Sequence, residues 1–182
     1  MEKTEMFVVA CLGNPGKKYA KNRHNIGFLL GDFIAEQLGI KLTASSFNSI
    51  SGKGTMQSHD VLLLMPQSYM NNSGGPIRKA LDFYKVPPER LVAIHDDIEL
   101  PFGEYRAKFG GGHKGHNGIR SIMQEIGTPD FHRIRFGIGR PESPEVAVAD
   151  HVLSNFTGEE LARIRELAPV VVDMLVSIIN GG

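Results

Sequence analysis

Three apolar runs, each leading into a polar cluster, constrain the fold of this chain more than any other feature. Runs of this length, rich in valine and leucine, are typical of buried strands. In sheets built from such strands, sites form beyond the carboxyl ends, so we expect the three polar clusters to meet at one edge. The runs are Met6–Leu12, followed by GNPG; Val61–Met65, followed by PQSYMNNSGG; and residues 91–97 (LVAIHDD), followed by IELP.

Helical patterns separate these strands. Apolar residues recur at helical spacing, and the last helix begins at Thr157 with Glu160 at capping-box spacing, with a kink expected near Pro169. Strands that alternate with helices predict an α/β fold with a twisted, mixed and largely parallel central sheet flanked by helices. The helices are expected at residues 25–39, 74–86, 118–127 and 157–180, a further strand at Ile134–Gly139, and an exposed hairpin or edge strand within residues 43–59.

Composition and length limit the class of protein. The 182 residues suit one domain, residues 1–182, and the formal net charge of zero argues against a generic polycation that coats nucleic acid. The single cysteine, Cys11, excludes an intrachain disulfide and fits a reducing, cytoplasmic compartment. The N-terminal apolar run is too short for a secretory signal, and residues 170–179 are too short and too polar to span a bilayer.

His24 and Asp96 are the candidates for acid–base chemistry. His24 lies just before the first helix, and histidine is the side chain best suited to general base catalysis near neutral pH. Asp96 ends a buried strand, where a carboxylate can orient an imidazole. The alternatives are a histidine that merely caps the helix, a solvated turn, or a magnesium site formed by Asp96, Asp97 and Glu99. No phosphate-binding GxxxxGK[ST] motif accompanies these carboxylates, which disfavours magnesium.

Two further clusters carry polar side chains. In SYMNNSGG, Asn71 and Asn72 suit hydrogen bonding to an amide-bearing substrate, although asparagine and glycine also form turns. In GGGHKGHNG, residues 110–118, His113 and His116 are three residues apart, which raises the possibility of a metal site. No further ligands follow at zinc spacing, and the stretch lacks the context of a dinucleotide-binding loop.

Local charge is more informative than net charge. One basic cluster lies in KKYAKNR, residues 17–23, and a second lies between Arg106 and Arg140. Two such patches on a neutral protein indicate localised phosphate contact, or else a solvated basic face. No G-x-S-x-G motif is present, and Cys11 lies in a buried strand where a thiol is unreactive. If the chain is a hydrolase, water is the expected nucleophile.

These motifs together resemble the bacterial peptidyl-tRNA hydrolases. The resemblance covers almost the whole chain, and the motifs follow one another in the family's order. They are CLGNPGKKYAKNRHNIG (residues 11–27), SYMNNSG (68–74), HDDIELPFG (95–103), GGGHKGHNG (110–118) and FHRIRFGIGRP (131–141).

The resemblance implies an esterase that cleaves the bond between a peptide's C-terminal carbonyl and the 3′-terminal ribose of tRNA, without a metal or an organic cofactor. It also implies a single α/β domain, a monomer, and peptidyl-tRNA as partner through its acceptor arm and nascent peptide. Position by position, it implies that His24 is the base and Asp96 its orienting partner. The other implied roles are substrate and water positioning by Asn14, Asn71 and Asn117, substrate binding by Tyr19, Met70 and His116, and a clamp on the tRNA 5′-phosphate by Lys108 and Arg135.

Two segments need separate comment beside the family resemblance. Residues 140–156, RPESPEVAVADHVLSNF, are expected to form a flexible flap over the cleft, and the chain ends at SIINGG where many relatives continue with a basic tail. Two alternatives to an esterase of peptidyl-tRNA remain open. One is an RNA-binding relative without catalysis, and the other is a hydrolase acting on a small phosphorylated ester.

Overall fold

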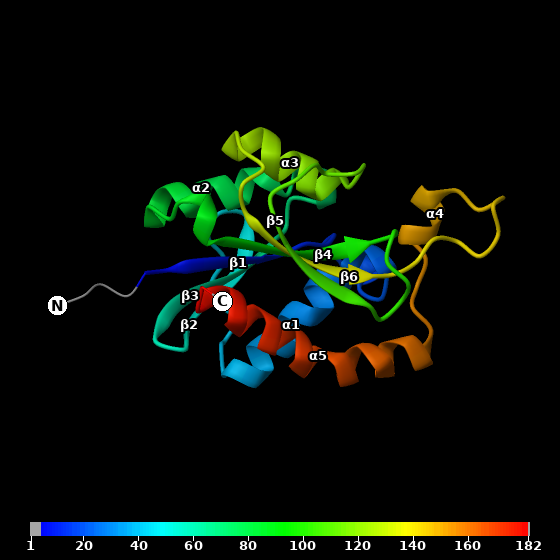
Figure 1. The fold of residues 1–182 in the computed structure, drawn as a ribbon, viewed down its shortest axis with the longest axis horizontal. Coiled ribbons are helices and arrows are strands. Elements are labelled where there is room, and N and C mark those ends of the chain that lie inside the picture. The colour runs from blue at the N-terminus through cyan, green and yellow to red at the C-terminus, as the bar shows by residue number, and fades with distance from the viewer. Residues whose placement is uncertain (1–4, 182) are drawn as a thin grey trace.

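The computed structural model describes residues 5–181, and its central feature is one six-stranded sheet in the order β2-β3-β1-β4-β6-β5 (Figure 1). β1 pairs in parallel with β3 and with β4, and β4 pairs in parallel with β6, while β2 and β5 are antiparallel edge strands. The expectation of a mixed, largely parallel sheet is therefore confirmed. The strands are β1 Phe7–Cys11, β2 Ser49–Met56, β3 His59–Pro66, β4 Leu91–Asp97, β5 Tyr105–Phe109 and β6 His132–Gly137.

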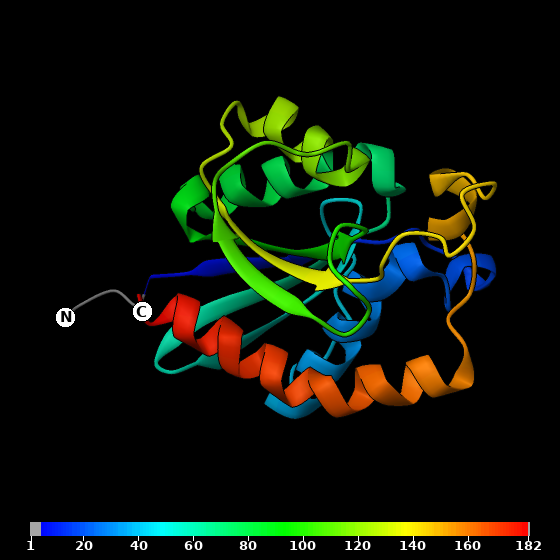
Figure 2. The same cartoon turned by 45° about the vertical axis from the view of Figure 1, so that its right-hand side comes forward.

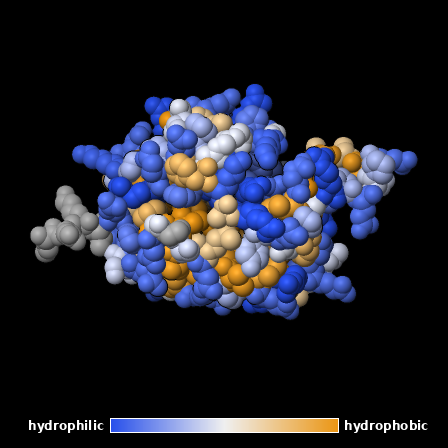
Figure 3. Space-filling model, in the orientation of Figure 1, coloured by the Kyte–Doolittle hydropathy of each residue, from blue (hydrophilic) through white to orange (hydrophobic). Residues whose placement is uncertain are grey.

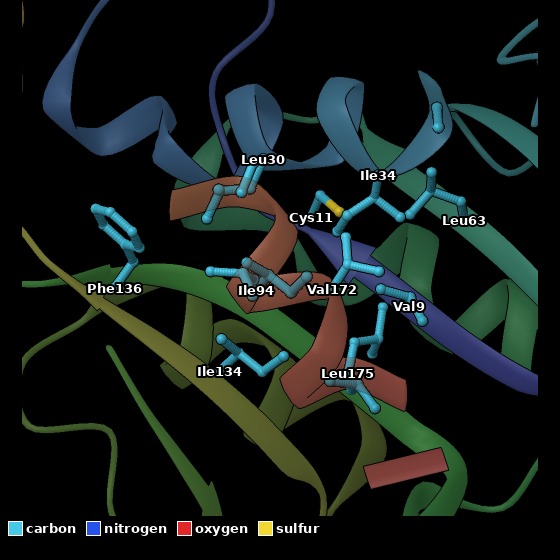
Figure 4. Packing of buried hydrophobic residues seen from close by; sticks show 14 of the residues in the cluster. Val9, Cys11, Leu30, Ile34, Leu63, Ile94, Ile134, Phe136, Val172 and Leu175 are labelled. Carbon is cyan, nitrogen blue, oxygen red and sulfur yellow. The ribbon is translucent and has the colours of Figure 1, made fainter. Parts of the chain in front are cut away.

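Helices cover both faces of this sheet. α1 (Ile26–Leu38) and α5 (Gly158–Ile179) lie on one face, and α2 (Gly74–Tyr84) and α3 (Asn117–Ile126) lie on the other (Figure 2). Alternate residues of the inner strands point into two separate apolar cores, as period-2 geometry requires. Figure 4 shows one core, in which Val9, Cys11 and Ile94 pack against Val172 and Leu175 of α5.

The start of α1 brings the chain close to the sheet. A Cβ at Gly27 would lie 2.4 Å from the backbone oxygen of Leu12 and 2.6 Å from that of Ile94, so only glycine permits this approach. The short 3-10 helix η2 (Arg23–Asn25) precedes α1 and is held against the carboxyl end of β4. This packing places His24 beside the polar end of that strand.

Several sequence expectations need correction. β5 was not expected, because its residues are largely exposed and show no apolar alternation. β6 begins at His132 and ends at Gly137, two residues earlier at each end than the expected strand. The capping box expected for α5 is confirmed, and α5 continues past Pro169 to Ile179; the kink near Pro169 stays a prediction.

The segment expected to form a flap contains the short helix α4 (Val148–Val152), which projects at one side of the molecule and contacts η2 (Figure 1). The face seen in Figure 3 is largely hydrophilic, with apolar residues gathered in patches on the body and on the arm that carries α4. Val146, Val148 and Leu153 on this arm are among the exposed large apolar residues. Within residues 5–181, no helix has the length and apolar character needed to cross a membrane.

Candidate active site

A cleft of about 670 Å³ opens at the carboxyl ends of the parallel strands. Its walls come from the segments after β1 and β3, the end of β4, the glycine-rich loop before α3, and α4. Sites at this edge are expected for such sheets, and the three polar clusters of the sequence do meet here. The ten residues to which the resemblance assigns roles all line it: Asn14, Tyr19, His24, Met70, Asn71, Asp96, Lys108, His116, Asn117 and Arg135.

The centre of the cleft is a carboxylate shared by two histidines. Asp96 Oδ2 lies 2.7 Å from His24 Nδ1, and Asp96 Oδ1 lies 2.7 Å from His116 Nε2. The Asp96 side chain is 2% exposed, against 13% for His24 and 12% for His116. Because an ionised carboxylate only accepts hydrogen bonds, each of these ring nitrogens carries the proton and donates it.

The two histidines differ in what remains available to a ligand. His116 caps α3, and its Nδ1 accepts from the backbone N–H of Ile119 at 3.2 Å, so both of its ring nitrogens are committed. His24 uses Nδ1 alone, and within residues 5–181 its Nε2 has no hydrogen-bond partner. His24 is thus the histidine of this pair with a lone pair available in the cleft.

Asp96 makes His24 easier to protonate than an ordinary histidine. Burial lowers the pKa of His24, but the Asp96 carboxylate outweighs burial, so the pKa is raised above its ordinary value. Burial opposes ionisation of Asp96, yet His24 and His116 together hold the pKa of that carboxyl well below its usual range. The arrangement therefore stabilises the imidazolium that forms when His24 accepts a proton.

His95, next to Asp96, is kept neutral. Burial and the neighbouring His116 lower the pKa of His95 to about 3. Its Nδ1 donates to the backbone oxygen of Asp96 at 2.7 Å, and its buried Nε2 has no partner among the residues that the structure describes. His95 supports the strand end from which the Asp96 carboxylate projects.

Asn14 is fixed by backbone and side-chain contacts. Its Oδ1 accepts from the backbone N–H of Met70 at 2.7 Å, and its backbone pairs with the buried side chain of Asn25 through two hydrogen bonds of 2.8 Å. With the oxygen engaged, the amide NH₂ is what Asn14 presents to a ligand. Asn71 and Asn117 are exposed on the cleft wall, with no side-chain hydrogen bond among the residues described.

Cations form the wall of the cleft next to the glycine-rich loop. Lys108 of β5 and Arg135 of β6 both lie there, and Arg135 Nη1 donates to Asp97 Oδ2 at 3.1 Å. Burial and the neighbouring cations, Lys114 foremost, lower the pKa of Lys108. Gly110 and Gly111 have φ values of +72° and +93°, which glycine adopts without strain, and they turn the chain directly after β5.

The carboxylates and histidines of the cleft are poorly disposed to hold a metal. Asp97 pairs with Arg135, Glu99 pairs with Arg140, and Asp96 accepts from two histidines, so the suggested magnesium ligands are engaged. The ligand atoms of His24, Asp96 and His116 do lie within 4.8 Å of one another. Metal binding at His116 Nε2 would move its proton to Nδ1, which already faces the N–H of Ile119.

Sequence reasoning gave no individual role to Arg133, which is buried beneath the glycine-rich loop. It donates to the backbone oxygens of Gly111 and Gly112 at 2.8 Å and of Pro129 at 3.0 Å. Arg133 and Arg135 are two residues apart on one strand and therefore share a face of the sheet. That alternation was the signal available in the sequence. Sequence reasoning also gave no role to Asn25, which orients Asn14.

Comparisons with known proteins cover nearly the whole chain. The sequence model of the family described as "Peptidyl-tRNA hydrolase" matches residues 8–182. The protein of that name from Geotalea daltonii is 43% identical over 175 residues, covering 96% of this chain and 91% of that protein. The one from Brevibacillus brevis is 45% identical over 168 residues, covering 92% and 88%. The crystal structure of peptidyl-tRNA hydrolase from Acinetobacter baumannii superposes with a TM-score of 0.89 at 38% identity, covering 100% of this chain and 92% of that one.

Proposed function

This chain belongs to the peptidyl-tRNA hydrolase family and hydrolyses peptidyl-tRNA, and we propose that His24 is the general base of that reaction. The observation that carries the proposal is the contrast between the two histidines on Asp96. His24 keeps Nε2 available in the cleft, whereas both ring nitrogens of His116 are committed.

The proposed reaction begins with a water molecule bound at His24 Nε2. The histidine takes one proton from the water as the water oxygen attacks the peptide's C-terminal carbonyl carbon. This carbon forms the ester bond to the terminal ribose. Asp96 stabilises the resulting imidazolium and keeps the ring in the tautomer that exposes Nε2. No covalent enzyme intermediate is required, because an ester is activated enough for direct attack by water.

The tetrahedral intermediate then collapses. The amide NH₂ of Asn14 is a donor whose own oxygen is fixed by Met70, so it is suited to stabilise the developing oxyanion. As the carbon–oxygen bond to the ribose breaks, His24 returns its proton to the departing 3′ oxygen. The products are a tRNA with a free 3′ hydroxyl and a peptide with a free carboxylic acid, which releases its proton to solvent and becomes a carboxylate.

Asn71 and Asn117 are proposed to bind the peptide backbone. Exposed amides both donate and accept, which suits a substrate whose peptide varies in sequence. Tyr19, Met70 and the ring of His116 would line the same subsite.

Lys108 and Arg135 are proposed to bind the 5′-phosphate of the tRNA acceptor arm. Both are cationic, and both line the cleft on the wall formed by β5 and β6. Consistent with a substrate made in translation and with a single buried thiol, we further propose a monomeric enzyme of the cytoplasm, one functional unit over residues 1–182.

The test is the release of intact tRNA and free peptide from a purified N-acyl-aminoacyl-tRNA. His24→Ala is expected to lower kcat by about 10²–10⁴-fold, the usual contribution of a positioned general base. His59→Gln is the matched control, because His59 begins β3 at the opposite end of the sheet. Turnover by His24→Ala at the wild-type rate would contradict the proposed mechanism.

A further inference from the structure

Arg133 is a buried cation whose hydrogen bonds go to backbone carbonyls. It lies on β6, is 2% exposed, and its guanidinium stacks over the ring of Phe131 at 4.5 Å from the centroid. Its three acceptors are the carbonyl oxygens of Gly111, Gly112 and Pro129. These bonds tie the glycine-rich loop to the sheet.

The positive charge of Arg133 has no carboxylate partner within residues 5–181. Its Nε is also buried and has no acceptor in the described part of the chain. Buried charges in proteins are normally paired, because removing an ion from water is costly. Two further cations lie close to Arg133: Arg135, two residues away on β6, and Lys108, its register partner on β5. The free protein therefore holds a cluster of cations short of negative charge.

Arg133 is also linked to Lys108 through the loop. It fixes the carbonyl of Gly111, and the Lys108 side chain folds directly over that residue. A Cβ at position 111 would lie 2.6 Å from both Cε and Nζ of Lys108. The path of Lys108 therefore depends on where Arg133 holds Gly111 and on the absence of a side chain there.

We propose that Arg133 is a positioning residue for phosphate recognition. It fixes the Gly111 backbone, so that Lys108 is placed over that residue. The phosphate of the substrate balances the buried charge of Arg133. The inference rests on the proposed function, because it takes the bound anion to be the 5′-phosphate of peptidyl-tRNA. It adds to the Lys108–Arg135 pair a third cation that stays beneath the loop and acts through it.

Steady-state kinetics on two matched substrates test this. The substrates are one N-acyl-aminoacyl-tRNA with its 5′-phosphate and the same molecule after removal of that phosphate. With Arg133→Gln, KM for the phosphorylated substrate is expected to rise about tenfold, the size expected for one lost charge-assisted contact. KM for the dephosphorylated substrate and both kcat values are expected to stay near wild type. Arg133→Lys keeps the charge but loses the planar guanidinium with its paired donors. It is therefore expected to restore only part of the preference for the 5′-phosphorylated substrate.

Gly111→Ala provides a test that leaves Arg133 in place. The added Cβ would displace Lys108, and the φ of +93° would strain the loop, so the phosphate preference is again expected to fall. Arg90→Gln is the control. Arg90 is a partly buried arginine that donates to the carbonyl of Met6, and it precedes β4 at the other end of the sheet.

Binding of inorganic phosphate gives a readout independent of turnover. Phosphate, compared with chloride at equal ionic strength, is expected to raise Tm for the wild type and Arg90→Gln, and to raise it much less for Arg133→Gln and Gly111→Ala. A folded Arg133→Gln that keeps the wild-type preference for the 5′-phosphate would overturn the inference, as would full recovery by Arg133→Lys. Failure of the wild type to release tRNA would instead count against the proposed function.

Discussion

The centre of the cleft and its cationic wall balance charge in opposite ways. At the centre, one buried carboxylate, Asp96, is shared by two histidines, and every polar atom of Asp96 and His116 side chains is engaged. At the wall, Lys108, Arg133 and Arg135 lie close together with Asp97 as the ion-pair partner of Arg135. The carboxylate of the first arrangement is fully hydrogen-bonded before substrate arrives, whereas the second arrangement is short of negative charge.

This difference separates two tasks that one cleft must perform. Catalysis needs a base held in one orientation and one tautomer, which a satisfied network supplies without reorganisation during the reaction. Recognition of a phosphate needs charge that becomes balanced when the ligand binds. Variants at the centre should therefore change kcat, and variants at the wall should change KM.

Asp96→Asn is expected to have the largest effect, because it removes the carboxylate on which the centre depends. An amide at this position no longer favours the tautomer that exposes His24 Nε2 or stabilises the imidazolium, so kcat is expected to fall by about 10²–10⁴-fold. The measurement is kcat as a function of pH.

The pH profile gives the sign of the electrostatic effect. The neutral form of His24 is the active base, so kcat rises with pH through its pKa. Asp96 raises that pKa, and the substitution should therefore move the acidic limb of the profile to lower pH. A limb that stays in place, or moves to higher pH, would show that Asp96 does not tune His24.

Lys108→Ala tests the wall and should leave kcat nearly unchanged. Loss of one phosphate contact is expected to raise KM about tenfold. It should also reduce the slope of log KM against log salt concentration by about 0.7–0.9, the contribution of one neutralised phosphate. A drop in kcat of similar size on substrates with and without the 5′-phosphate would remove the distinction between the two regions.

The sequence predicted the satisfied region better than the unbalanced one. His24 and Asp96 could each be singled out, because His24 lies just before a helix and Asp96 ends a buried strand, and the resemblance to the family implied that they pair. The engagement of both His116 ring nitrogens could not be predicted, because it depends on the ring reaching both Asp96 and the backbone N–H of Ile119.

The wall was harder for a different physical reason. β5 is an exposed edge strand without an apolar pattern, and it was missed, although it carries Lys108. Arg133 was visible only as one charge in a basic stretch. Its burial follows from β6 lying between β4 and β5 and from the loop folding over it, which are contacts between segments distant in sequence.

Asp97→Asn sharpens the comparison, because this residue is adjacent to Asp96 but belongs to the other region. Asp97 pairs with Arg135 at 3.1 Å, and removing its charge leaves that arginine free for the phosphate. KM for the 5′-phosphorylated substrate is expected to fall a few-fold, about 2–5-fold for a half-buried ion pair, while kcat stays near wild type. A loss of kcat comparable to that of Asp96→Asn would place both carboxylates in one network.

Chelation should have the smallest effect, because activity is expected to survive prolonged treatment with EDTA. A divalent ion at the centre would have to displace the hydrogen bonds of Asp96 with both histidines and reverse the tautomer of His116 against the N–H of Ile119. EDTA also removes magnesium from folded tRNA, so the enzyme is treated and desalted before magnesium-folded substrate is added at a magnesium concentration equal to that of the control. Under these conditions the chelated and untreated enzymes should give the same kcat. Inhibition that zinc or manganese reverses would mean that the three side chains at the centre bind a metal during catalysis, and the contrast between a satisfied centre and an unbalanced wall would no longer hold.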